Sequence, residues 1–193
     1  MPHPDAQVWN ARYLSAEKHN LRRQPYGLVR SFADQLPKGG LALEVAAGTA
    51  PVGLYLARRG LRVISMDISE AGLRIAQQRA LNPLLPINLV VMDLTNPWLP
   101  PLGFDVILNF YYLSRPLFES YHKALKPGGW LFFETFVQDS LGRCNPAHTL
   151  EPGELINSFH DWDILHWMET WKKRRDGMFP SRRIAQLVAR KTI

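Results

Sequence analysis

The sequence has little cysteine and no long apolar run. Its 193 residues include one cysteine, Cys144, which cannot form a disulfide within the chain and fits a reducing compartment. No apolar stretch approaches the roughly 20 residues that span a bilayer. The start, MPHPDAQVWNAR, lacks the basic and apolar regions of a signal peptide. We therefore expect a cytoplasmic protein that makes no membrane contact.

Several catalytic motifs are missing as well. The sequence contains no H-x-x-H or H-E-x-x-H pair, and no carboxylate cluster follows the fourth predicted strand, so we predict no metal site. Neither Ser69 nor Ser114 lies in a G-x-S-x-G elbow, which leaves a serine hydrolase without support.

The composition indicates one globular domain spanning residues 1–193. Apolar residues make up 46% and charged residues 21% of the chain. The net charge of +6 raises the prospect of a nucleic-acid partner, but the basic residues are dispersed and only 172–175 form a dense run. Because no stacking-aromatic signature of an RNA-binding module is present, we do not favour nucleic acid. Nothing indicates an oligomeric state.

Apolar strands alternate with helical patterns along the chain, as expected for an α/β fold with a parallel sheet. Strands are predicted at 41–46, 62–67, 87–92, 105–110, 130–136, 163–170 and 184–190. Helices are predicted near 8–18, 26–36, 51–59, 70–80, 114–125 and 153–159.

The first predicted strand runs into a loop rich in glycine and alanine, LALEVAAGTAPVG. Residues 48–53 form a degraded G-x-G-x-x-G, and Asp67 follows Gly48 by 19 residues, where a dinucleotide-binding protein places its ribose-binding acid. Read as acid-x-G-x-G-x-G instead, the stretch retains one of three glycines, with Ala46 and Ala50 as departures. The loop alone does not decide between these readings.

Further segments carry a resemblance to a known family. LALEVAAGTAPVG, VISMDIS, VVMDLTNPWLP, FDVILNFYYLSRPLF and LKPGGWLFFETF together resemble the class I S-adenosylmethionine-dependent methyltransferases, near their tellurite-resistance and thiopurine branch. The resemblance implies a Rossmann-like, seven-stranded, mostly parallel sheet with helices on both faces and an antiparallel last strand. It also implies a helical lid over residues 1–36 and a sheet core over 40–193.

The resemblance implies a site for S-adenosylmethionine at the carboxyl ends of the first four strands. Asp67 is expected to bind the ribose hydroxyls and Asp93 the adenine amino group, although Asp93 also fits an Asx-turn. Arg12 is expected to pair with the methionyl carboxylate, beneath a lid that carries Trp9 and Tyr13. The remaining expected contacts come from Glu44, Ala46, Gly48, Ile68, Leu94 and Asn109.

The acceptor is harder to predict. We expect metal-independent methyl transfer to oxygen, nitrogen, sulfur or a chalcogen of a small molecule, with an RNA or protein methyltransferase or a non-catalytic cofactor-binding protein as alternatives. The catalytic candidates are Tyr111, Tyr112, Glu134 and His148. Glu134 serves either as a loop anchor, which we favour, or as a general base, and Arg115 is expected to form a local salt bridge.

Overall fold

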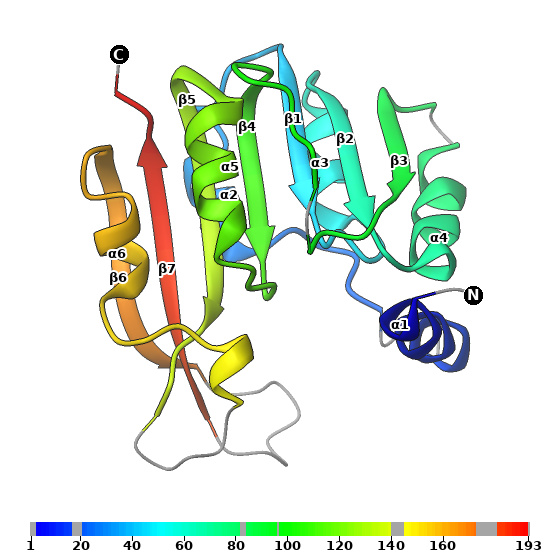
Figure 1. Ribbon diagram of the computed structural model, residues 1–193. Coiled ribbons are helices and arrows are strands. Elements are labelled where there is room, and N and C mark those ends of the chain that lie inside the picture. The colour runs from blue at the N-terminus through cyan, green and yellow to red at the C-terminus, as the bar shows by residue number, and fades with distance from the viewer. Residues whose placement is uncertain are drawn as a thin grey trace.

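The computed structural model describes residues 3–16, 21–81, 84–95, 97–139, 145–172 and 181–192. It contains a seven-stranded sheet with helices on both faces (Figure 1). The strands are β1 (Leu41–Val45), β2 (Arg62–Asp67), β3 (Ile87–Val91), β4 (Phe104–Phe110), β5 (Leu125–Phe136), β6 (Asp163–Lys172) and β7 (Arg182–Arg190). The helices are α1 (Pro4–Ser15), α2 (Gly27–Phe32), α3 (Pro51–Arg58), α4 (Glu70–Ala80), α5 (Pro116–Ala124), α6 (Glu154–Ser158) and the 3-10 helix η1 (Pro146–His148).

The strand order is β3-β2-β1-β4-β5-β7-β6. Strands β1 to β5 pair in parallel, and β7 runs antiparallel to both β5 and β6. The predicted seven-stranded sheet with an antiparallel last strand is confirmed. The chain fills one side of β1 first and then crosses to β4, so the order reverses between β1 and β4. In open α/β sheets, ligands bind outside the carboxyl ends of the strands at such a point.

The two faces of the sheet bury separate apolar clusters because successive strand residues point to opposite faces. Leu43 and Ile107 pack in the cluster that includes residues of α5 and α6. Ala42 and Val106 pack in the cluster that includes residues of α2 and α3. Figure 1 shows α5 and α6 in front of the sheet and α2 and α3 behind it. These two layers fix the strand ends that carry the candidate site.

No helix among the described residues is long and apolar enough to cross a membrane.

Candidate functional site

A cavity of about 470 Å³ lies at the carboxyl ends of the central strands, within the size range of small-molecule sites. It lies at the switch point of the strand order. Seven of the ten residues predicted to contact a cofactor line it: Trp9, Arg12, Ala46, Asp67, Ile68, Asp93 and Leu94. Two of the four catalytic candidates, Tyr111 and Tyr112, also line it. The other predicted residues lie elsewhere, for the reasons given below.

The loop between β1 and α3 adopts the left-handed conformation at three positions. Ala46, Gly48 and Ala50 have φ angles of 48°, 55° and 47°. Two of these are alanines, in a conformation that costs a residue with a Cβ about 1–2 kcal/mol. The turn is held by hydrogen bonds from the Ala47 N–H to the Met66 carbonyl (3.0 Å) and from the Ala50 N–H to the Ala47 carbonyl (2.8 Å). These hydrogen bonds hold Ala46 and Ala50 in a backbone conformation that glycine adopts more readily.

Glu44 holds this loop from below and does not line the cavity. Its carboxylate is buried and accepts hydrogen bonds from the Val52 N–H (3.3 Å), the Gly53 N–H (3.0 Å) and the Ser65 hydroxyl (2.8 Å). Burial raises the pKa of Glu44 to about 7, although these three donors oppose the shift. Glu44, one of the predicted cofactor contacts, therefore binds the start of α3 and is not among the described residues that line the cavity.

Asp67 lies at the end of β2 on the wall of the cavity. One carboxylate oxygen accepts a hydrogen bond from the Gly48 N–H and the other from the Ser69 N–H, both at 2.7 Å. The side chain is 7% exposed, and burial is the main cause that raises its pKa. Each oxygen keeps acceptor capacity, since an ionised carboxylate offers about four lone-pair sites. The backbone therefore presents a fixed acceptor pair to the cavity.

Asp93 also lines the cavity but in a looser setting. Its side chain is 43% exposed, and the imidazole of His3 lies 3.8 Å away. One oxygen accepts a hydrogen bond from the Thr95 N–H at 2.9 Å, so the Asx-turn that the sequence left open is present. The hydrogen bond from Thr95 lowers the pKa of Asp93. Asp93 thus combines a turn with a place on the cavity wall.

Helix α1 covers the cavity beside Asp67. Trp9, Arg12 and Tyr13 all line the cavity, and the Arg12 guanidinium lies 4.9 Å from the centre of the Trp9 ring. Asn10 ties the helix to the start of α4, because its side-chain oxygen accepts hydrogen bonds from the Ser69 hydroxyl (2.8 Å) and the Ala71 N–H (2.9 Å). Sequence reasoning missed this contact.

Gly48 lies against the Tyr13 hydroxyl, where a Cβ would collide with that oxygen. The missing side chain of Gly48 therefore leaves room for Tyr13 of α1. Gly48 is not among the described residues that line the cavity. Burial, followed by the nearby Asp67, raises the pKa of Tyr13 to about 12, so the hydroxyl stays protonated at neutral pH.

The opposite wall of the cavity is anchored by a polar network around Tyr111, which has a left-handed φ of 60°. The Tyr111 hydroxyl donates a hydrogen bond to the Glu134 carboxylate. The Lys172 ammonium donates to the Tyr111 hydroxyl (2.8 Å) and to the same Glu134 oxygen (2.5 Å), and Gln186 donates to the second oxygen (2.6 Å). Burial and the Glu134 charge raise the pKa of Tyr111 far above its ordinary value.

These contacts join the Glu134 carboxylate to Tyr111, Lys172 and Gln186 rather than to the described part of the loop that follows β5. The Glu134 side chain is 1% exposed and is not among the described residues that line the cavity, so it lies behind Tyr111. Its roles as loop anchor and as general base both stay predictions. The Tyr111 hydroxyl donates to Glu134 and accepts from Lys172.

Aromatic rings and a second arginine complete this wall. Tyr26 stacks on Phe110 with ring centres 4.1 Å apart and lies 5.5 Å from Tyr111. The Arg22 guanidinium lies 4.2 Å from the Tyr26 ring centre, and the Arg22 carbonyl accepts a hydrogen bond from Arg79 at 3.0 Å. Sequence reasoning missed Arg22 and Tyr26, because they precede the first strand and no motif connects them to β4.

Two further candidates lie away from the cavity lining. Asn109 is buried in β4, and its side-chain nitrogen and oxygen have no hydrogen-bond partner among the described residues. His148, a predicted catalytic candidate, is exposed in η1 and is not among the described residues that line the cavity.

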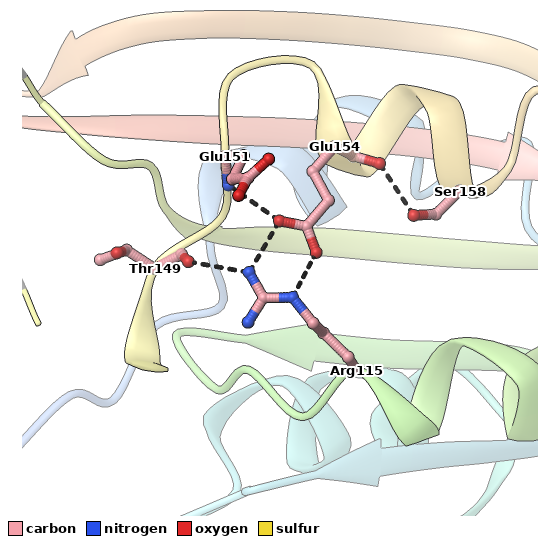
Figure 2. Close-up of polar contacts among 5 residues, drawn as sticks. All are labelled: Arg115, Thr149, Glu151, Glu154 and Ser158. Carbon is pink, nitrogen blue, oxygen red and sulfur yellow. Dashed lines mark hydrogen bonds and ion pairs between the residues drawn. The ribbon is translucent and has the colours of Figure 1, made fainter. Parts of the chain in front are cut away.

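Arg115 explains the position of the segment that carries η1. Its guanidinium binds both carboxylate oxygens of Glu154 at 2.6 and 2.8 Å and donates to the Thr149 carbonyl at 3.2 Å (Figure 2). Glu154 also accepts a hydrogen bond from the Glu151 N–H. The predicted salt bridge of Arg115 is present, but its partner Glu154 lies 39 residues further along the chain and not nearby in the sequence. It joins the start of α5 to the segment that leads into α6.

The sequence is similar to those of known methyltransferases. Residues 42–129 match the family described as a methyltransferase domain. The chain is 28% identical over 125 residues to a ubiquinone biosynthesis O-methyltransferase of Idiomarina loihiensis, covering 61% of this chain and 50% of that protein. It is 32% identical over 110 residues to the protein of the same name from Chromobacterium violaceum, covering 53% and 47%. The chain thus spans about half the length of these curated relatives.

Among solved structures, TehB from Haemophilus influenzae superposes with a TM-score of 0.77 at 20% identity, covering 87% of this chain and 63% of that chain. At this identity the likeness concerns the fold. Residues 42–129 are thus similar to a methyltransferase domain, and the chain has a cavity at the strand ends where open α/β sheets bind their ligands.

Proposed function

We propose that this protein binds S-adenosylmethionine in the cavity and transfers its methyl group to a small-molecule acceptor without a metal ion. The observation that carries the proposal is Asp67. Its carboxylate ends β2 on the cavity wall and is oriented by two backbone N–H groups. A ribose diol needs a fixed pair of acceptors, and charge-assisted hydrogen bonds of this kind are about twice as strong as neutral ones.

The remaining lining residues fit the other parts of the cofactor. Ile68 and Leu94 would flank the adenine, and Asp93 would accept from its amino group. Arg12 would pair with the methionyl carboxylate, while Trp9 on α1 would shield the sulfonium by a cation–π contact. We therefore propose that α1 is the lid of the site. Glu44 has a supporting role in this arrangement, since it holds the loop that carries Ala46.

Methyl transfer from a sulfonium is an in-line displacement, for which the bound cofactor supplies the electrophilic methyl group. The work of the chain is to align the acceptor and exclude water. Tyr111 and Tyr112 line the cavity after β4, and the network behind Tyr111 fixes its ring. Because the pKa of Tyr111 is raised, this residue keeps its proton and positions the acceptor rather than deprotonating it.

A thermal-shift panel tests the proposal. S-adenosylmethionine and S-adenosylhomocysteine at 100 times their Kd should each add about 2.7 kcal/mol to the free energy of unfolding, whereas NAD and NADP should add nothing. Stabilisation by NAD and not by S-adenosylhomocysteine would refute the proposal. In a following assay with EDTA present, methyl incorporation only into RNA or protein would replace the small-molecule acceptor with a macromolecule.

A further inference from the structure

Two arginines line the cavity, one more than the cofactor requires. Arg12 comes from α1, and Arg22 precedes α2. Among the described residues, neither guanidinium forms a salt bridge with a carboxylate. S-adenosylmethionine has a single carboxylate, so whichever arginine holds it, the other guanidinium remains available. A cation that faces a ligand cavity favours a negative charge on the ligand.

Three carboxylates among the described residues line the cavity: Asp5 on α1, Asp67 at the end of β2 and Asp93 after β3. The Arg22 guanidinium lies over Tyr26, whose ring packs on Phe110 and Tyr111 at the end of β4. This second wall of the cavity therefore carries a guanidinium of its own, which suits an anionic group on a ligand.

The carboxylate that contacts this second wall is already neutralised. Glu134 is 1% exposed and pairs with Lys172 at 2.5 Å, with Gln186 on its other oxygen. It therefore offers no free negative charge to repel an anionic ligand. The Tyr111 hydroxyl is engaged by the same network, so its ring rather than its hydroxyl is left to face a bound molecule.

From this arrangement we propose that the methyl acceptor is a small aromatic acid. Its ring packs against Tyr26 and Tyr111, and its anionic group pairs with Arg22. This proposal rests on the proposed function and specifies its substrate class. Arg22 is positioned to bind this anionic group, because its carbonyl accepts a hydrogen bond from Arg79 and its guanidinium lies over the Tyr26 ring. Arginine suits it chemically, because its planar fork matches a carboxylate in a bidentate pair.

The test compares two probes that differ only in charge, 4-hydroxybenzoate and 4-hydroxybenzamide. Each is titrated by calorimetry into the full chain saturated with S-adenosylhomocysteine. The acid should bind at least about tenfold more tightly than the amide, the scale expected for hydrogen bonds to a charged group. Arg22→Gln should abolish this preference. Arg30→Gln, which changes an exposed arginine of α2 outside the cavity lining, should preserve it.

The other outcomes are equally decisive. If Arg12→Gln abolishes the preference for the acid and Arg22→Gln weakens the binding of S-adenosylhomocysteine instead, the pairing of the anionic group with Arg22 is overturned. If the acid binds no better than the amide, or neither binds, the proposal is overturned. If S-adenosylhomocysteine itself does not bind, the proposed function fails, and the same two probes titrated into the unliganded protein still measure the preference for an anion.

Discussion

The two ends of the cavity are built in different ways. At the β2 end, Asp67 is held by the backbone N–H groups of Ser69, two residues away, and of Gly48, 19 residues away. At the β4 end, Tyr111 is held by side chains that lie 23 and 61 residues away in the sequence. The first end depends on backbone donors and the second on a network of side chains. A substitution should therefore affect ligand binding at the first end and stability at the second.

The largest effect should come from Lys172→Met. It leaves the buried Glu134 carboxylate without its cation, and breaking a buried pair costs about 3–5 kcal/mol. Because Lys172 is 42% exposed, we expect about 3 kcal/mol less stability in chemical denaturation. Lys123→Met is the matched control, since the Lys123–Glu119 pair is exposed on α5 and its loss should leave stability unchanged. Equal stability of the two variants would show that the network does not support the fold.

Next in size is the effect of Asp67→Ala on cofactor affinity. We expect a loss of about 2 kcal/mol for S-adenosylhomocysteine in calorimetry, the worth of hydrogen bonds to a charged group. Asp93→Ala should cost less, because Asp93 is half-exposed and its binding energy competes with water. A larger loss at Asp93 than at Asp67 would reverse the assignment of the main cofactor contact.

The smallest effect concerns pH and Glu44. Its folded pKa of about 7 lies above its ordinary value of 4.5, so the native state binds more protons than the unfolded state between these values. The stability contribution of Glu44 is therefore present below pH 4.5 and lost as pH rises through about 7. Wild type should lose on the order of 1–2 kcal/mol more than Glu44→Gln between pH 5 and pH 6.5. Denaturation curves with parallel pH dependence would contradict this account.

The difference between the two ends also explains what the sequence could predict. The seven strands were predicted because apolar runs that alternate with helical patterns are local signals in the sequence. Asp67 was found for the same reason, since it ends a strand. The partner of Glu134, Lys172, was not predicted, because it lies on β6. Glu134 and Lys172 come together only because β5 and β6 both pair with β7.

Two predicted site residues, Glu44 and His148, lie off the described cavity lining for reasons that a sequence pattern does not carry. Glu44 was placed correctly at the end of the first strand, but its carboxylate turns under the loop to bind the start of α3. His148 was chosen by its position in a loop, whereas the Arg115–Glu154 pair fixes the surrounding segment and leaves His148 exposed. For both residues, the direction in which the side chain points decides whether the residue lines the cavity, and the position of the residue in the sequence does not reveal that direction.

The most direct test of the two-ended cavity is a crystal structure of the protein with S-adenosylhomocysteine. The account predicts that both ribose hydroxyls lie within hydrogen-bond distance of the Asp67 carboxylate, with Trp9 over the ligand and the sulfur facing the wall formed by Tyr111 and Tyr112. A ligand whose ribose lies against Arg22 and Tyr26, with no contact to Asp67, would contradict it.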